Sequence, residues 1–148
     1  MSYIRTWLLG ALILTLVPAC GASKQATAHA VAIEVAHGLV DTAGHAVDDG
    51  CAIAVRRAGS LARAEEIAST CREAASTQRA LVAAWGLWAR SVLAKLAEDA
   101  FDLNQAALFG REVLRLYMQL AEAVNAIAEG DPLPPPPEAI RLLLGGDL

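Results

Sequence analysis

The stretch LNQAALFGREVLRLYMQLAEAVNAIAE, residues 103–129, carries the clearest periodic pattern in the chain. Its apolar side chains recur at spacings of three and four, the repeat that places residues on one side of an α-helix. The stripe consists of Leu103, Ala106, Phe109, Val113, Leu116, Leu120, Val124 and Ile127. Asp102 precedes the stretch as an N-cap and Gly130 follows it, so we expect one helix whose apolar side packs against other helices.

Two more helices are expected before this one, over residues 26–57 and 61–100. The stripe of the first consists of Ile33, Ala36, Val40, Ala43, Val47, Cys51 and Ala54. The stripe of the second consists of Ala64, Ile67, Cys71, Ala74, Leu81, Trp85, Trp88, Val92 and Leu96. Both follow the same helical spacing, so each predicts a long helix with one buried side.

The connection between these two helices is expected at residues 58–60. Arg56 and Arg57 suit a helix C-terminus, and Ser60 is a favourable N-cap for the next helix. Asp48-Asp49-Gly50 is an alternative turn inside the first helix, and Ser76-Thr77 is an alternative break inside the second.

The C-terminal part begins with a proline run, Pro134 to Pro137, which must adopt extended polyproline II. It is interpreted as a rigid connector, or alternatively as a ligand for an aromatic groove on a partner. Residues 137–145 then predict a two-turn helix, because proline starts it and glycine ends it. Its apolar side chains should fold back on the bundle or meet a partner; they are Ile140, Leu143 and Leu144.

Together these elements predict an all-α fold, an up-down-up bundle of three long helices with a short C-terminal helix after a Pro-rich spacer. The bundle spans residues 26–130, and the spacer and short helix span residues 131–148. Hydrophobic residues make up 55% of the 148 positions, but aromatic residues only 5%. Alanine favours helices and buries little area, so we expect one domain with a thin core.

The N-terminal segment has a different character. Arg5 precedes an apolar run of eleven residues, from Trp7 to Val17, which suits the apolar region of a secretory signal peptide. A helix needs about 20 apolar residues to cross a bilayer, so this run is too short for a comfortable permanent span. Residues 1–19 are therefore predicted to be a signal peptide, and residues 20–25 a tether.

The end of that segment, Val17-Pro18-Ala19-Cys20, resembles the lipobox of bacterial lipoproteins. The resemblance implies cleavage before Cys20, which then carries a covalent lipid that includes palmitate. It also implies a location in the bacterial cell envelope, at the outer membrane facing the periplasm if the host is Gram-negative. The alternative is ordinary signal-peptidase cleavage near Gly21 or Ala22, which leaves a soluble secreted or periplasmic protein.

The chain contains three cysteines. If lipid occupies Cys20, then Cys51 and Cys71 remain as a pair in a compartment that permits disulfides. Both lie on apolar stripes, on either side of the expected turn at residues 58–60. We therefore predict a disulfide between Cys51 and Cys71.

A line of histidines and carboxylates runs along the first helix, at spacings of 3, 4, 4 and 3; it consists of Glu34, His37, Asp41, His45 and Asp48. At about 100° per residue these side chains fall within roughly 80° of one another. Imidazole and carboxylate groups suit Zn²⁺, Cu²⁺ or Ni²⁺, so Glu34, His37, Asp41 and His45 are candidate metal ligands. The same pattern is typical of a solvated helix face. His29 lies away from the line and is expected to be exposed.

Trp85 and Trp88 lie one turn apart on the second helix and either line an apolar ligand pocket or belong to the core. For catalysis, the sequence has no G-x-S-x-G elbow, no H-E-x-x-H, no phosphate-binding glycine loop and no CxxC pair. We therefore do not expect an enzyme. The net charge of −4 argues against nucleic acid as a partner.

These observations favour a non-catalytic exported lipoprotein that acts by protein–protein interaction, in an accessory, scaffold or exclusion role. Its expected partners are the membrane, through the lipid on Cys20, and another envelope protein; no cofactor is expected. The alternative is a periplasmic metal- or small-ligand-binding helical module, built on the Glu34 to His45 line or around Trp85 and Trp88.

Overall fold

The computed structural model describes residues 24–97, 102–127 and 132–144, without the side chains of residues 95–97. The signal peptide, Cys20, the side chain of Leu96 and the predicted helix ends at Ala100 and Glu129 lie outside this part of the chain. Four helices are described: α2 (Lys24–Arg57), α3 (Leu61–Ala97), α4 (Leu103–Ile127) and α5 (Glu138–Leu143).

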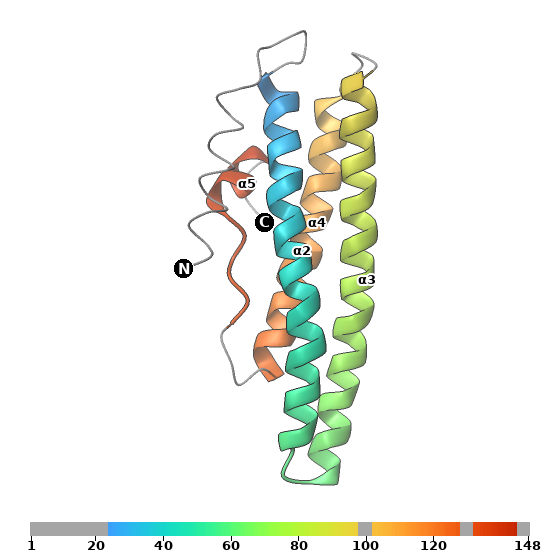
Figure 1. The fold of residues 1–148 in the computed structure, drawn as a ribbon, viewed down its shortest axis with the longest axis vertical. Coiled ribbons are helices and arrows are strands. Elements are labelled where there is room, and N and C mark those ends of the chain that lie inside the picture. The colour runs from blue at the N-terminus through green and yellow to red at the C-terminus, as the bar shows by residue number, and fades with distance from the viewer. Residues whose placement is uncertain (1–23, 98–101, 128–131, 145–148) are drawn as a thin grey trace.

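The three long helices alternate in direction, which is the predicted up-down-up topology, and they pack side by side (Figure 1). The short α5 packs against α2 beside them. This arrangement confirms the predicted all-α bundle with a short C-terminal helix. Among the described residues, no helix combines the length and apolar character that crossing a bilayer requires.

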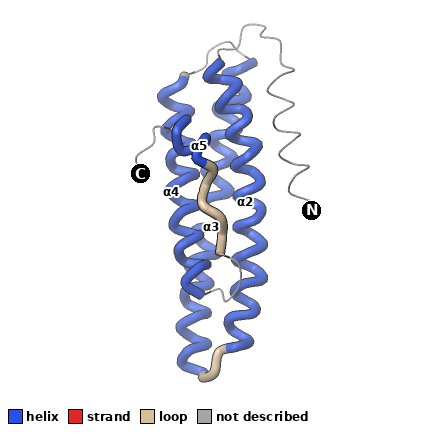
Figure 2. Tube along the Cα trace, turned by 90° about the vertical axis from the view of Figure 1, so that its left-hand side faces the viewer, coloured by secondary structure: helices blue, strands red, loops and turns tan. Residues whose placement is uncertain are grey.

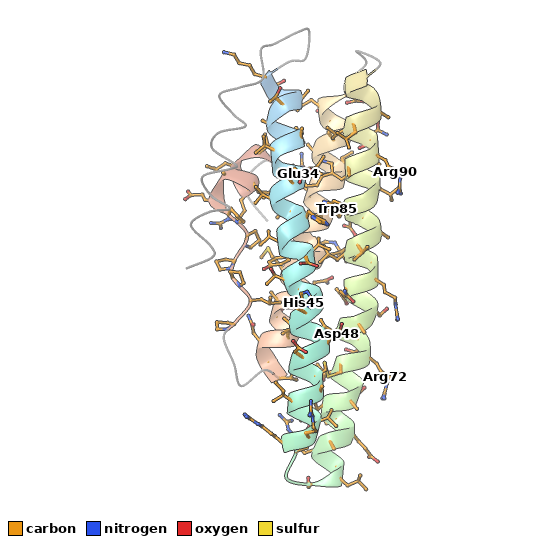
Figure 3. All side chains as sticks on the ribbon, viewed as in Figure 1. Glu34, His45, Asp48, Arg72, Trp85 and Arg90 are labelled. Atoms are coloured by element: carbon orange, nitrogen blue, oxygen red, sulfur yellow. A yellow bond between two sulfur atoms is a disulfide. The ribbon has the colours of Figure 1, made fainter. Side chains whose placement is uncertain are left out.

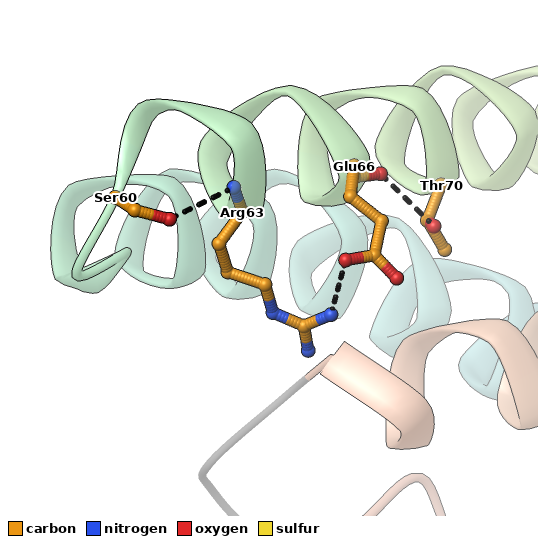
Figure 4. Close-up of polar contacts among 4 residues, drawn as sticks. All are labelled: Ser60, Arg63, Glu66 and Thr70. Atoms are coloured by element: carbon orange, nitrogen blue, oxygen red, sulfur yellow. Dashed lines mark hydrogen bonds and ion pairs between the residues drawn. The ribbon is translucent and has the colours of Figure 1, made fainter.

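The turn between α2 and α3 forms where the sequence predicts it. The Ser60 hydroxyl accepts a hydrogen bond from the Arg63 backbone N–H at 3.2 Å and thereby caps α3 (Figure 4). The Arg63 guanidinium pairs with the Glu66 carboxylate at 2.6 Å in the same first turns. Both partners are more than half exposed, so this pair contributes little to stability.

Both alternative breaks inside the long helices are wrong. α2 continues through Asp48-Asp49-Gly50, because Val47 and Ala54 on either side are buried and keep the helical stripe in phase. α3 continues through Ser76-Thr77 for the same reason, since the buried residues Ala74 and Leu81 flank it. Burial of the stripe therefore outweighs the local turn preference of these short polar residues.

Helix α4 begins as predicted, because the Asp102 carboxylate accepts hydrogen bonds from the backbone N–H groups of Asn104 and Gln105 at 3.0 and 3.2 Å. Leu103 of the predicted stripe is exposed, but the buried side of α4 is otherwise wider than predicted. It has four additional buried residues: Ala107, Gly110, Leu114 and Tyr117. The width has a structural cause. α4 packs against α2 and α3, and Gly110 and Tyr117 also meet the C-terminal segment.

The C-terminal segment, residues 132–144, folds back along the bundle instead of extending away from it (Figure 2). Leu133 is buried, and its backbone N–H donates to the Asn125 side-chain oxygen at 2.8 Å. The Tyr117 hydroxyl donates to the Pro134 carbonyl at 2.6 Å. Burial raises the pKa of Tyr117 to about 12, which keeps this donor protonated. Two hydrogen bonds, one at Leu133 and one at Pro134, thus hold the start of this segment against α4.

The C-terminal end of this segment packs into the hydrophobic core of the bundle. Ile140 and Leu144 are buried and Leu143 is half-buried, so the C-terminal helix folds back on the bundle, the first of its two predicted alternatives. Gly110 on α4 makes the approach possible: a Cβ atom there would lie 2.9 Å from Leu144 Cδ1 and 3.0 Å from Trp88 Cζ2. Both separations are below ordinary van der Waals contact, so only glycine fits without displacement of its neighbours.

His29 corrects one expectation, because its side chain is fully buried. It lies four residues before Ile33, on the inward side of α2, and meets Trp88 edge-on with ring centroids 6.0 Å apart. The burial of His29 follows from the helical period, which places it on the inward side of α2, and not from its closeness to the tether. Burial lowers the pKa of His29 below its ordinary value, because the charged form is poorly solvated there.

Candidate interaction surface on helices α2 and α3

Helices α2 and α3 meet along a seam with a seven-residue repeat. His37 contacts Trp85, Gly44 faces Gln78, and Cys51 is bonded to Cys71. These positions advance by seven on α2 and retreat by seven on α3, as in an antiparallel coiled coil. The seam therefore fixes which residues of the two helices lie at the same level.

The predicted disulfide between Cys51 and Cys71 is present, with the two Cα atoms 5.8 Å apart. It joins α2 to α3 through two cysteines that are 20 residues apart in sequence. On the loop-closure argument a link of this span contributes about 3 kcal/mol to the free energy of unfolding. That is a large share for a domain whose net stability is typically about 5–15 kcal/mol.

The two tryptophans have separate surroundings. Trp85 is half-buried in the seam, where its indole N–H donates to the Ile33 carbonyl at 3.1 Å and its ring stacks against His37 at 4.8 Å. Trp88 is fully buried in the core. Among the described residues, its indole nitrogen has no hydrogen-bond acceptor. Trp88 is thus a core packing residue, whereas Trp85 packs in the seam and is partly exposed to solvent.

A row of carboxylates lies beside the seam on α2; it consists of Glu34, Asp41 and Asp48, which are exposed and seven residues apart. His45 approaches Asp41 at 3.9 Å, with both side chains more than two-thirds exposed. His37 instead stacks on Trp85. In the part of the chain that the structure describes, no three His, Cys, Asp or Glu side chains are grouped so that they could hold a metal ion.

A row of arginines lies on the exposed side of α3; it consists of Arg72, Arg79 and Arg90. Arg72 and Arg79 each follow a seam residue. The next position in this repeat is Gly86, and the Arg90 guanidinium lies over it, with Nη1 3.5 Å from where a Cβ would be. In Figure 3, Arg72 and Arg90 project from α3, and Trp85 lies between the two helices.

The two rows lie level with each other. By the register of the seam, Glu34, Asp41 and Asp48 are level with the buried residues Trp88, Leu81 and Ala74. Each of these is two residues from an arginine of the row, which is about 3 Å of helical rise. Within the described residues, no ion pair joins the two rows.

Small and apolar side chains accompany the charges on α3, near the seam: Val82, Gly86, Ala89 and Leu93. Val82 is 44% exposed and Leu93 is 56% exposed, whereas Gly86 and Ala89 are half-buried. We call the carboxylate row, the arginine row, Trp85 and this apolar strip the α2–α3 surface. It has opposite charges on its two helices and apolar groups beside them.

Comparisons with known proteins do not extend this description. No protein-family model, no curated protein and no solved structure matches the chain significantly.

Part of this surface is predicted from the sequence, namely the carboxylate and histidine line on α2 and the cysteine pair. The arginine row and the contact between His37 and Trp85 are not predicted. The signal was present in the spacing. Cys71, Gln78 and Trp85 are seven residues apart, as are His37, Gly44 and Cys51, and two of the arginines follow one of these series.

Proposed function

We propose that the protein is a non-catalytic lipoprotein of the bacterial cell envelope that binds another protein through the α2–α3 surface. The lipobox-like segment that ends at Cys20 supports the lipid anchor and the location. The surface supports the mode of action, which is an accessory, scaffold or exclusion role.

The observation that carries the proposal is the arrangement of the two charged rows. Three carboxylates on α2 and three guanidinium groups on α3 lie at matching levels, and no ion pair joins them in the described residues. A partner with the reversed order of charges would neutralise both rows at once. Complementary charges of this kind contribute orientation and specificity to an interface more than affinity.

The apolar strip would supply affinity. Val82 and Leu93 are half exposed, and burial of apolar area contributes about 25 cal/mol per Å². Trp85 adds a rigid aromatic side chain, a residue type that is enriched in protein–protein interfaces. Gly86 and Ala89 would let a partner helix approach closely.

The proposed anchor would hold this surface near the membrane. α2 begins at Lys24, so the chain between Cys20 and the helix is at most about 14 Å long. Partners attached to the same membrane would meet the surface at a raised effective concentration. A weak interface is then sufficient for function.

Site-specific photo-crosslinking in membranes tests this proposal. A photoreactive amino acid would replace Val82 on the α2–α3 surface and, as a matched control, the exposed Gln119 on α4. We expect specific protein adducts from position 82 and few from position 119. Equal labelling from both positions, or none from position 82, would contradict the proposed interaction surface.

A further inference from the structure

We infer that the partner of the α2–α3 surface is a second copy of this chain, docked with the helices of the two copies parallel. The inference rests on the proposed function and specifies the partner. In this dimer, a two-fold axis runs along the helices in front of the surface. It brings α2 of each copy against the exposed side of α3 of the other.

The register of the seam makes the charges match. Rotation about an axis parallel to the helices leaves the level of every residue unchanged. Because Glu34, Asp41 and Asp48 are level, within about 3 Å, with Arg90, Arg79 and Arg72, each carboxylate of one copy meets an arginine of the other. The symmetry then repeats the three pairings in the opposite direction.

The charges also reject the antiparallel dimer. A two-fold axis across the helices would place α2 against α2 and α3 against α3. The carboxylate rows would then face each other, as would the arginine rows, and like charges in an interface are strongly unfavourable. The sequence of charges along one chain thus selects the parallel orientation.

The rest of the surface fits the same arrangement. Val82, Gly86, Ala89 and Leu93 lie near the axis, where two α3 helices approach, and small residues permit the usual 8–10 Å between helix axes. The α2–α3 surface is two helices wide, about 20 Å, and about 30 Å long from Arg72 to Leu93. It therefore offers roughly 600 Å² per copy, which is the lower end of the range for standard interfaces.

The proposed anchor agrees with this orientation on independent grounds. In the parallel dimer both α2 helices begin at the same end, so both lipids can enter one membrane. In an antiparallel dimer the two ends would lie about 50 Å apart, at opposite ends of the 34-residue α2 helices.

Two charge-reversed variants of the full-length lipoprotein test the inference in detergent by sedimentation velocity. The first carries Glu34→Arg, Asp41→Arg and Asp48→Arg; the second carries Arg72→Glu, Arg79→Glu and Arg90→Glu. Each variant alone opposes like charges, so its self-association should weaken about 100-fold or more relative to the natural chain. Mixed together, the two variants restore every pairing and should form a heterodimer.

A matched control for the first variant carries the same change in net charge away from the surface, with Glu112→Arg, Glu122→Arg and Glu138→Arg on α4 and α5. It should dimerise like the natural chain. All substituted residues are exposed, so circular dichroism should show the same helical fold in every variant.

The outcomes separate this inference from the proposed function. A monomeric natural chain, or a charge-reversed variant that self-associates as well as the natural chain, would overturn the dimer. If crosslinking from position 82 then yields only an adduct with a different protein, the proposed function stands and this inference fails. If position 82 yields no adduct and the natural chain is monomeric, the surface is simply solvated and both fail.

Discussion

The two ends of the bundle are held together in different ways. Around Trp88, three helices and the C-terminal segment interlock through large side chains and the glycine at position 110. At the other end, α2 and α3 extend past the end of α4 as a pair (Figure 1). The segment from Cys51 to Cys71, which contains the turn between these two helices, is closed by the disulfide and has two buried side chains, Ala54 and Ile67.

The comparison shows how an alanine-rich chain distributes its stability. Large aromatic side chains bury about 150–250 Å² each, so a few of them stabilise the three-helix part. Within the described part of the chain, no third helix covers the two-helix end, and a covalent link stabilises it where the core is small. Neither device uses the charged rows of the α2–α3 surface, so these rows remain available for a partner.

The largest effect is expected from truncation at the three-helix end. Trp88→Ala removes a fully buried indole and should lower the free energy of unfolding by about 3–5 kcal/mol. Leu87→Ala, at the neighbouring and half-exposed position, should change it by less than about 1 kcal/mol. Urea denaturation followed by circular dichroism measures both, and equal losses would show that Trp88 is not a core residue.

Loss of the disulfide should act at the other end. Reduction, or Cys51→Ser with Cys71→Ser, should cost about 3 kcal/mol. By hydrogen exchange, the loss of protection should concentrate in residues 52–70, while amides around Trp88 stay protected. Thiol titration of the exported, unreduced protein should find neither cysteine free. Two alkylated thiols in the folded protein would refute the link.

Alanine substitutions at two helical glycines contrast a position surrounded by side chains with one that is open to solvent. Gly110→Ala should destabilise the protein by about 1–3 kcal/mol, because the new methyl group displaces Leu144 and Trp88. Gly38→Ala should instead stabilise it by up to about 1 kcal/mol, because nothing lies within 4 Å and alanine favours the helix. Thermal melts of both variants test this contrast, and a shift of the same sign would contradict it. Adding Leu144→Ala to Gly110→Ala should give less than the sum of the separate losses.

Trp88, the disulfide and Gly110 also show which features of this fold can be predicted from the sequence. The helices, their order, the cap at Ser60 and the cysteine pair follow from local pattern, because period, capping and spacing are properties of neighbouring residues. The role of Gly110 does not, since it depends on Leu144 and Trp88, which are distant in sequence. The expectation that His29 is exposed is wrong, because its place in the helical period determines its burial and its closeness to the tether does not.

Acid should weaken the three-helix end through His29. Burial lowers the pKa of His29 in the folded protein, so below its ordinary value of 6.5 the unfolded chain binds a proton that the folded chain does not. Stability should therefore fall as the pH falls through 6.5, and this dependence should diminish in His29→Leu. Denaturant midpoints between pH 8 and pH 5 measure it; equal pH dependence in both proteins would contradict the assignment.

The smallest effect is expected from divalent metal. Among the described residues, His37 is stacked on Trp85 and His45 approaches a single carboxylate, that of Asp41. We therefore expect calorimetry with Zn²⁺, Cu²⁺ or Ni²⁺ to show no binding tighter than about 10 µM. A tight isotherm that disappears in a variant with His37→Ala and His45→Ala would instead favour the metal-binding alternative.

The central claim of the proposed function is that this bundle works from a membrane, attached through Cys20. Metabolic labelling with palmitate in a bacterial host tests it most directly. The account predicts that label enters the natural protein, and that Cys20→Ser abolishes incorporation and either releases the protein from membranes or stalls its processing. Label that persists in Cys20→Ser, or its absence from the natural protein, would contradict the claim.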